Sequence, residues 1–304
     1  MQKFDIKNWS KNVFKPKKKP KVKLTFAQEL VSWGKTLLWA IIVVMFINGA
    51  ILASFVVPTG SMEDTVMPGD FLFVNKLIYG PSTPQIIPFI NQPLPFYKFP
   101  GFKDPKQGDV IVFIFPGEQN EVKPSKFEYY LKRCIASAGD TLQVINKRVY
   151  VNRKEFSLPK HGKYDIAIPE LYASFPGGNL WTKDNYGPIR IPKEGDIIKL
   201  TAANIMEWRV FIMREGHDVA TDGMNIYIDN KATKQYVVER DYCWGMGDNR
   251  DHSSDSRFWG FIPYDNVVGT PLFVYWSWDP GIKFVHLFDK LASLRLSRIF
   301  TIIR

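Results

Sequence analysis

The sequence predicts a mainly β protein with antiparallel strands, preceded by one N-terminal transmembrane helix. After residue 60, short runs of β-branched and aromatic residues are separated by Gly-Asp and Asn-Lys turns, which is typical of antiparallel sheets. Helical periodicity is scarce in this part and is suggested only at 202–215. Before residue 60, the chain contains one long uncharged apolar run.

The net charge of +10 is concentrated in the first 23 residues, which contain nine lysines and a single acidic residue, Asp5. The rest of the chain is close to neutral, so the sequence predicts no nucleic-acid-binding face on the body of the protein. The two cysteines are too few for a disulfide scaffold or a four-ligand structural zinc site. We expect neither a metal ion nor another cofactor.

The apolar run at 37–57 predicts a membrane anchor. Its 21 residues carry no charge, and a helix of that length spans about 30 Å, the thickness of a bilayer core. A cleaved signal peptide has a shorter apolar region, and a core helix has an amphipathic stripe, so we predict an uncleaved anchor over 35–57. The positive-inside rule then places the basic tail, residues 1–34, in the cytoplasm and the chain after residue 57 on the opposite face.

Several segments of the remaining chain have the composition of strands, because β-branched and aromatic residues follow one another between turn residues. These segments lie at 108–116, 148–152, 195–200, 224–230, 234–248 and 270–278.

Two other segments predict irregular structure. Residues 81–105 contain seven prolines among aromatic residues, a density that prevents a regular helix or a central strand. We expect a long loop that either dips its aromatic side chains into the bilayer surface or packs on the domain. The C-terminal segment, 283–304, is apolar but interrupted by charges. It predicts either an interfacial element or a core strand preceded by a short helix.

The first concentration of functional groups lies in VPTGSMEDTVMPGD, residues 57–70. Ser61 lies four residues beyond the apolar run, in a turn where Gly60 lets the backbone approach a ligand closely. The segment is not the G-x-S-x-G elbow of α/β-hydrolases.

A candidate base lies in YYLKRCIASAGD, residues 129–140. Strand alternation directs Tyr130, Lys132 and Cys134 to one face. A lysine on a half-buried strand loses hydration, which lowers its pKa and lets the neutral amine act as a general base. Taken alone, the segment favours an ordinary surface lysine.

A third polar cluster occurs in GMGDNRDHSSDSRFWGFIP, residues 245–263. Its spacing does not match a calcium-binding loop, so we expect ion pairs and hydrogen bonds across a site. His252 is the only histidine among these groups and is an alternative base for Ser61, although histidines at loop tips are common.

These motifs together resemble those of bacterial type I signal peptidases. The chain has an anchor, then P-T-G-S-M (58–62), G-D-F-L-F-V-N-K (69–76), L-K-R-x₅-G-D (131–140) and G-D-N-R-x₂-S-x-D-S-R (247–257), in the order found in that family. The resemblance extends over roughly residues 35–299.

The resemblance implies an antiparallel β catalytic core formed by 58–142 and 241–304, with a β-rich extension at 143–240 inserted in it. It implies a serine endopeptidase with a serine–lysine dyad, bound to the bacterial cytoplasmic membrane by a single span and facing its outer side. The substrates would be exported preproteins, cut after small residues at positions −1 and −3 of their signal peptides. Lipid bilayer is the other expected partner, and no active-site residue is expected in the extension.

The resemblance also assigns roles to individual residues. Ser61 corresponds to the nucleophile and Lys132 to the general base, while the Thr59 side chain and the backbone N–H of Ser61 correspond to the oxyanion hole. Ser253 corresponds to the serine that orients the lysine. The supporting residues are Asp255 and Arg257, with Asp248 and Arg250 nearby, and the substrate-pocket residues are Phe55, Val57, Met62, Val66 and Leu131.

Some features depart from the family or leave alternatives. Asp64 stands where the family often has proline, and Ala136 and Ala138 stand where it usually has glycine and proline. We expect Cys134 and Cys243 to be buried free thiols, with a disulfide as the alternative.

Three rival functions are a self-cleaving serine–lysine protease of related fold, a membrane-tethered binding protein and a Ser61/His252 hydrolase. The anchor and the lack of a DNA-binding region argue against the first. The presence of both Ser61 and Lys132 argues against the second. Replacement of His252 would test the third.

Overall fold

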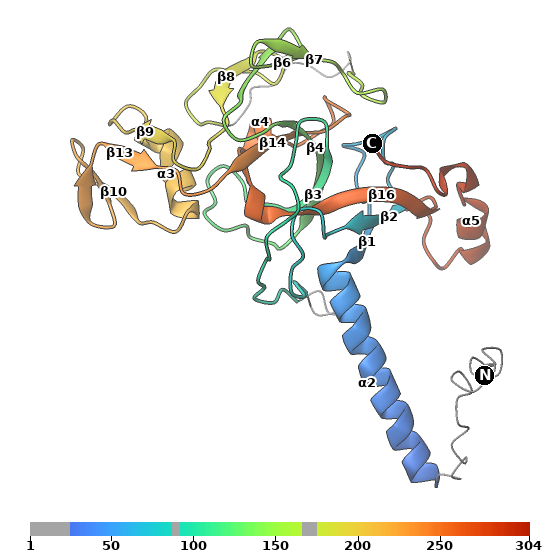
Figure 1. Cartoon of the computed structure of the whole chain (residues 1–304). Helices are drawn as coiled ribbons and strands as arrows, with labels where there is room; N and C mark the ends of the chain where they lie inside the picture. Colours follow the sequence, from blue (N-terminus) through green and yellow to red (C-terminus); the bar gives the residue numbers. More distant parts are fainter. Residues whose placement is uncertain (1–24, 87–91, 166–174) are drawn as a thin grey trace, which may run out of the picture. The chain divides into compact units, whose positions relative to one another are not determined.

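The computed structural model describes residues 25–86, 92–165 and 175–304 (Figure 1). Most of the predicted cytoplasmic tail therefore lies outside the described residues. The chain forms two compact units, Met1–Val44 and Met45–Arg304, and each is described by itself.

Helix α2, Phe26–Ala50, is long and apolar enough to cross a membrane. It begins and ends earlier than the predicted anchor of 35–57, which is a correction to its boundaries. Residues Leu52–Val56 instead form strand β1, which pairs antiparallel with β2. This segment is a strand because one of its faces is buried. Ala53 and Val57 pack into the core, as the two-residue period of a strand allows.

The centre of the second unit is a seven-stranded antiparallel sheet, which confirms the predicted fold class (Figure 1). Its strand order is β1-β2-β16-β3-β4-β14-β15. The remaining bounds are β2 Asp70–Asn75, β3 Val110–Ile114, β4 Tyr129–Ala136, β14 Tyr242–Met246, β15 Ile262–Pro263 and β16 Val267–Ser277.

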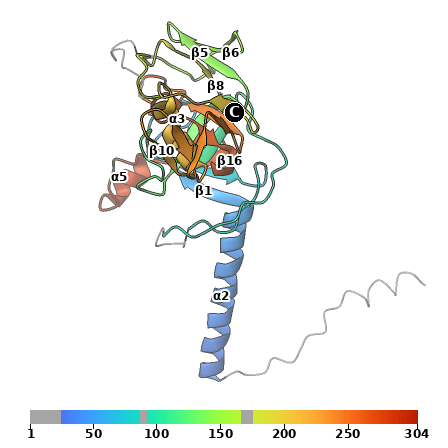
Figure 2. The same cartoon turned by 90° about the vertical axis from the view of Figure 1, so that its left-hand side faces the viewer.

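A β-rich extension lies between β4 and β14 along the chain, as predicted. Figure 2 shows part of its four-stranded sheet at the top of the view, beyond α3 and β16. The sheets have the orders β7-β6-β5-β8, β10-β11-β12 and β13-β9. The bounds are β5 Thr141–Ile145, β6 Arg148–Val151, β7 Lys154–Phe156, β8 Tyr186–Arg190, β9 Ile197–Lys199, α3 Ile205–Arg214, β10 Val219–Thr221, β11 Ile226–Ile228, β12 Lys231–Thr233 and β13 Gln235–Val237.

The extension shares a hydrophobic core with the central sheet. Leu142, Tyr186 and Phe211 of the extension pack in one cluster with Ile135 of β4 and Trp244 of β14. Burial of apolar surface against the central sheet contributes about 25 cal/mol per Å². The extension is therefore not a separate lobe.

The shorter elements mostly follow the sequence. Helix α3 confirms the periodicity at 202–215. The C-terminal segment contains the predicted short helix, α5 Leu287–Ala292, but only an isolated bridge between Phe273 and Ile302 instead of a strand. The other short helices are α4 Ser256–Trp259, η1 Tyr264–Asn266 and η2 Leu296–Arg298.

The described part of the proline-rich loop packs on the domain. Lys98 Nζ donates hydrogen bonds to the carbonyl oxygens of Tyr264 and Val267, at 2.6 and 2.7 Å. Tyr97 and Phe102 of the same loop are exposed. Contact of these rings with a bilayer stays a prediction.

Candidate active site

A cleft of about 570 Å³ lies over the curled face of the central sheet. Strands β1 and β4 are separated by three strands in the sheet order, yet the rings of Phe55 and Tyr129 are only 4.9 Å apart between centroids. The sheet therefore curls until these two strands face each other. Most side chains lining the cleft come from the end of β1, the loop after it, and β4.

Ser61 and Lys132 meet at this cleft. Lys132 Nζ donates a hydrogen bond to Ser61 Oγ at 2.7 Å, although 71 positions separate the two residues. Ser61 is 9% exposed and Lys132 is 4% exposed. Ser61 follows the end of β1 in a tight turn, and Lys132 occupies the middle of β4, so a turn and a strand supply the two groups.

Burial lowers the pKa of Lys132 to about 8. Removal of water disfavours the ammonium form, and the positive charge of Arg257 acts in the same direction, whereas Asp255 and Asp248 act against it. Within the described part of the chain, no carboxylate forms an ion pair with Lys132. Its amine is therefore neutral in a sizeable fraction of molecules near neutral pH, as a general base requires.

Thr59 lies at the mouth of the cleft. It is exposed, it lines the cleft together with Ser61, and its hydroxyl has no hydrogen-bond partner among the described residues. An unpaired hydroxyl two positions before a nucleophile is free to donate to an oxygen of a bound group.

The Ser253 side chain does not make the contact that the resemblance implied. Its side chain is buried, but its hydroxyl has no hydrogen-bond partner in the described structure, so the expected contact with Lys132 is not formed here. Ser253 lies against Gly247, where a Cβ would collide with Ser253 Oγ and with the Ser61 carbonyl oxygen. Gly247 thus allows these two serines to approach each other.

Asp255 and Arg257 form a buried pair, as predicted. Arg257 Nε and Nη2 donate to the two Asp255 carboxylate oxygens, both at 2.8 Å. Burial alone would raise the pKa of Asp255, but the charge and hydrogen bonds of Arg257 hold that pKa below its ordinary value. Asp255 also accepts the backbone N–H of Gly247 at 3.1 Å, which links the pair to the strand beside Lys132.

Asp248 pairs with a residue that the sequence analysis did not select. Arg133 Nε and Nη2 donate to its carboxylate at 2.8 and 2.7 Å, and Thr65 Oγ1 donates at 2.7 Å. The arginine in the L-K-R motif was the available signal, because strand alternation directs it to the face opposite Lys132. Arg250 is buried with its Nε and Nη2 unpaired, and its guanidinium lies 6.0 Å from the ring centre of Tyr164.

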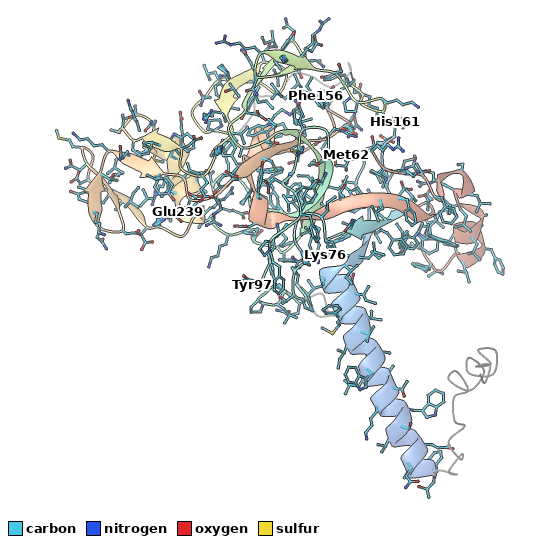
Figure 3. All side chains as sticks on the ribbon, in the orientation of Figure 1. Met62, Lys76, Tyr97, Phe156, His161 and Glu239 are labelled. Atoms are coloured by element: carbon cyan, nitrogen blue, oxygen red, sulfur yellow. The ribbon has the colours of Figure 1, made fainter. Side chains whose placement is uncertain are left out.

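Four of the five predicted pocket residues line the cleft: Phe55, Val57, Met62 and Leu131. Met62, labelled in Figure 3, is also buried and accepts the backbone N–H of Asp248 on its sulfur at 3.3 Å. Val66 does not line the cleft. It packs behind it in the hydrophobic cluster, because the turn after Ser61 directs it into the core. The lining residues that sequence reasoning missed include Leu72, Val112 and Tyr129.

His252 lies at the rim of the cleft but points to another partner. Its Nε2 is 2.9 Å from Asp165 Oδ2, and its side chain is exposed. The hydroxyl of Ser61 is instead bonded to Lys132. This geometry does not favour a Ser61/His252 pair.

A family model described as "Signal peptidase, peptidase S26" matches residues 30–276 of the chain. The chain belongs to this family. Signal peptidase I of Helicobacter pylori strain J99 is 32% identical over 268 residues, which cover 81% of each chain. Signal peptidase I of Rickettsia typhi strain Wilmington is 30% identical over 301 residues, covering 92% of this chain and 95% of the relative. The chain is accordingly a peptidase of family S26, and removal of signal peptides is the activity of the family.

The crystal structure of a signal peptidase I from Enterococcus faecalis V583 is also similar, at 18% identity and a TM-score of 0.27. The match covers 55% of this chain and 97% of that one.

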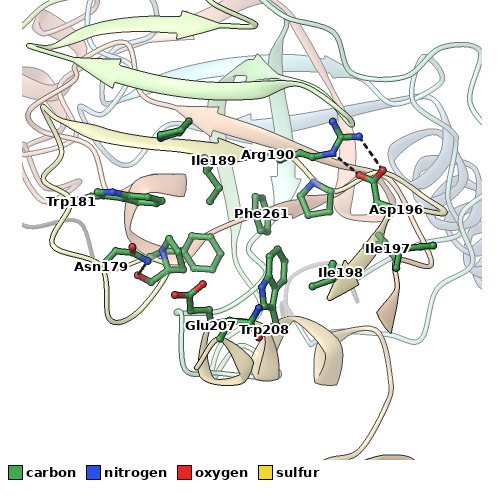
Figure 4. A pocket seen from close by; sticks show the side chains of 16 residues that line it. Asn179, Trp181, Ile189, Arg190, Asp196, Ile197, Ile198, Glu207, Trp208 and Phe261 are labelled. Carbon is green, nitrogen blue, oxygen red and sulfur yellow. Dashed lines mark hydrogen bonds and ion pairs between the residues drawn. The ribbon is translucent and has the colours of Figure 1, made fainter. Parts of the chain in front are cut away.

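A second cavity, about 480 Å³, lies in the extension between β8, β9 and α3 (Figure 4). Trp181, Trp208 and Phe261 contribute aromatic walls, and Arg190 pairs with Asp196 at its edge at 3.0 Å. None of the predicted site residues lines it. Ser61 and Lys132 line the first cleft instead.

Proposed function

We propose that the chain is a membrane-anchored serine endopeptidase that removes N-terminal signal peptides from exported preproteins, with Ser61 as nucleophile and Lys132 as general base. The observation that carries this proposal is the 2.7 Å hydrogen bond between the two buried side chains. The lowered pKa of Lys132, about 8, supports the role of base, because a charged lysine has no lone pair to accept a proton.

In the proposed first step, neutral Lys132 takes the proton of Ser61 while Oγ attacks the carbonyl carbon of the scissile peptide bond. The carbonyl oxygen becomes an oxyanion that accepts hydrogen bonds from the Thr59 hydroxyl and the Ser61 backbone N–H. Lys132, now an ammonium, returns its proton to the leaving nitrogen. The C–N bond breaks, the mature protein leaves with a free amine, and the signal peptide remains as an ester on Ser61.

In the proposed second step, Lys132 is neutral again and takes a proton from a water molecule. The resulting hydroxide attacks the ester carbon, and the ester bond to Oγ breaks. Ser61 recovers its proton from Lys132, and the signal peptide leaves as a carboxylic acid that releases its proton to solvent. One residue thus serves as base and acid in both steps.

The surrounding ion pairs support the dyad. We assign Asp255 and Arg257 to bracing the segment behind Lys132, and Asp248 to joining that segment to β4 through Arg133. Ser253 and Arg250 carry unpaired buried polar atoms, which cost free energy unless a partner arrives. We assign Ser253 to orienting the Lys132 amine when substrate closes the cleft.

The apolar walls of the cleft support cleavage after small residues. Phe55, Val57, Met62 and Leu131 present apolar surface next to Ser61, which suits small apolar side chains. We assign these four residues to the pockets for positions −1 and −3 of the signal peptide.

Helix α2 supports membrane anchoring, with the basic tail in the bacterial cytoplasm and the catalytic unit on the outer side. A signal peptide is itself an apolar segment in the bilayer. An enzyme confined to the same surface meets its cleavage site at a higher effective concentration than a free enzyme.

The test is cleavage of a model preprotein by the full-length, detergent-solubilised chain, with product termini read by mass spectrometry. We expect cleavage after a small residue by wild type, and no cleavage by Ser61→Ala or Lys132→Met. His252→Ala is the matched control and should retain activity. Activity that survives Lys132→Met, or disappears in His252→Ala, would contradict the dyad.

A further inference from the structure

A short segment of the extension runs beside the loop that follows β14. Lys163 and Asn249 form a parallel β-bridge. The backbone N–H of Lys163 donates to the Asp248 carbonyl at 2.9 Å, and the Arg250 N–H donates to the Lys163 carbonyl at 3.0 Å. The extension is thus joined by backbone hydrogen bonds to the loop that carries Asp248 and Arg250.

Asn249, at the centre of this bridge, holds the turn that contains Ser61. Its backbone N–H donates to the Ser61 carbonyl at 3.0 Å. Its side-chain amide donates to the Gly60 carbonyl at 3.1 Å and to Glu63 Oε2 at 3.3 Å. Hydrogen bonds from Asn249 therefore hold the turn both before and after the Ser61 side chain.

The Lys163 side chain reaches the same turn from the extension. Its Nζ lies 3.1 Å from Glu63 Oε2 and 3.1 Å from Asp64 Oδ2. Asp64 has a φ of 73°, in the left-handed region that residues other than glycine rarely adopt. Such a conformation persists only where the surroundings impose it, and Lys163 is the cation that binds both carboxylates next to it.

From these contacts we propose that Lys163 is a positioning residue for the nucleophile. Its ammonium fixes Glu63 and Asp64, these hold the turn, and the turn keeps Ser61 Oγ within hydrogen-bonding distance of Lys132. The proposal rests on the proposed function of Ser61 and Lys132. It also gives the extension a role in catalysis, which the sequence did not predict.

Positioning matters here because Ser61 belongs to a loop, whereas Lys132 belongs to a strand. The chain before Gly60, at Pro58 and Thr59, is exposed. Displacement of a reacting group by 1 Å can lower a rate by about 100-fold. A pair of exposed salt bridges, by contrast, adds little to overall stability.

The experiment compares Lys163→Met with Lys160→Met in the full-length protein. Lys160 is an exposed lysine of the same segment and makes no side-chain hydrogen bond or ion pair among the described residues. For Lys163→Met we expect kcat to fall about tenfold while KM changes less than about twofold. Lys160→Met should match wild type, and all proteins should unfold at similar temperatures because residue 163 is partly exposed.

Two further variants separate positioning from a general structural effect. Lys163→Arg keeps a cation that can bind two carboxylates and should recover at least about half of the lost rate. In a Glu63→Gln/Asp64→Asn background, Lys163→Met should add less than about a twofold loss, because the contacts are already removed.

The proposal would be overturned if Lys163→Met kept the wild-type kcat or changed KM alone. It would also be overturned if Lys163→Met lowered kcat as much in the Glu63→Gln/Asp64→Asn protein as in wild type. If Ser61→Ala and Lys132→Met are inactive in the same assay, those results leave the dyad standing. Activity that survives Ser61→Ala would overturn both proposals.

Discussion

At the scale of single residues, the important quantity is the pKa of Lys132. A lysine in water has a pKa near 10.5 and is almost fully charged at pH 7. Burial in the cleft lowers this pKa to about 8, so about a tenth of the molecules hold the neutral amine at pH 7. The buried ion pairs nearby belong to other residues, and Lys132 is left with Ser61 as its hydrogen-bond partner.

The first prediction concerns the pH dependence of kcat/KM. Activity requires neutral Lys132, so kcat/KM should rise about tenfold per unit below pH 7, bend near pH 8 and level off above pH 9. The measurement is kcat/KM between pH 6 and 10 for wild type and for His252→Ala. The two profiles should coincide. A bend near pH 6.5, typical of histidine, or a profile shifted by His252→Ala would contradict Lys132 as the base.

The second prediction concerns Thr59, whose hydroxyl is proposed to donate to the oxyanion. Thr59→Val keeps the shape of the side chain and removes the donor, so kcat should fall about 100- to 1000-fold. Thr59→Ser keeps the hydroxyl and is the matched control, expected to remain within about tenfold of wild type. Single-turnover cleavage of a preprotein measures both, and equal rates for the two variants would remove Thr59 from the oxyanion hole.

At the scale of secondary structure, the short helix α4 depends on one carboxylate. Asp255 is its N-cap, with its side chain accepting the Arg257 N–H, and it also pairs with the Arg257 guanidinium and accepts the Gly247 N–H. The buried Asp255 side chain therefore holds the start of α4, the Arg257 guanidinium and the chain at the end of β14. A helix of four residues has little stability of its own, so these contacts define the element.

The third prediction follows from this arrangement. Asp255→Asn leaves the Arg257 charge buried without a counter-charge, which should lower the free energy of unfolding by about 3 to 5 kcal/mol. Asp265→Asn removes a carboxylate that is largely exposed and 3.6 Å from Arg240, and it should change stability by less than about 0.5 kcal/mol. Chemical unfolding of the detergent-solubilised variants measures the difference. Similar unfolding midpoints would show that the buried pair does not hold this region.

At the scale of the whole molecule, the proposed arrangement of the chain across the membrane would determine which substrates it meets. Helix α2 joins a lysine-rich tail to the catalytic unit. Both native cysteines are buried free thiols, as predicted, so they should be unreactive toward labels in the folded protein. Introduced cysteines can therefore report topology without a background signal.

The fourth prediction concerns this topology. Lys154→Cys, at an exposed position of β7, should react with a membrane-impermeant maleimide in intact spheroplasts. Ser10→Cys, in the basic tail, should react only after the membrane is permeabilised, because the positive-inside rule retains this segment in the cytoplasm. Labelling of unmodified protein is the control for background. The reverse pattern would invert the proposed orientation.

Local patterns in the sequence accounted for much of the molecule. Strand composition predicted an antiparallel β protein, helical periodicity at 202–215 predicted α3, and the turn residues around Ser61 placed that serine in a tight turn. The end of helix α2 was harder to predict, because residues 37–57 carry no charge and only Asn48 and Ser54 interrupt the apolar run. Pairing of β1 with β2 supplies the hydrogen bonds that end the helix early.

The contacts among distant residues were decided by tertiary structure alone. The curl of the sheet brings Ser61 to Lys132 across 71 positions, and only that enclosure lowers the lysine pKa. Arg133 meets Asp248 across 115 positions, Val66 packs behind the cleft, and Lys163 reaches Glu63 from the extension. Periodicity over a few residues of the sequence determines which secondary-structure elements form and which of their faces are buried. Partners across long separations depend on strand order, register and curvature, which exist only in the folded chain.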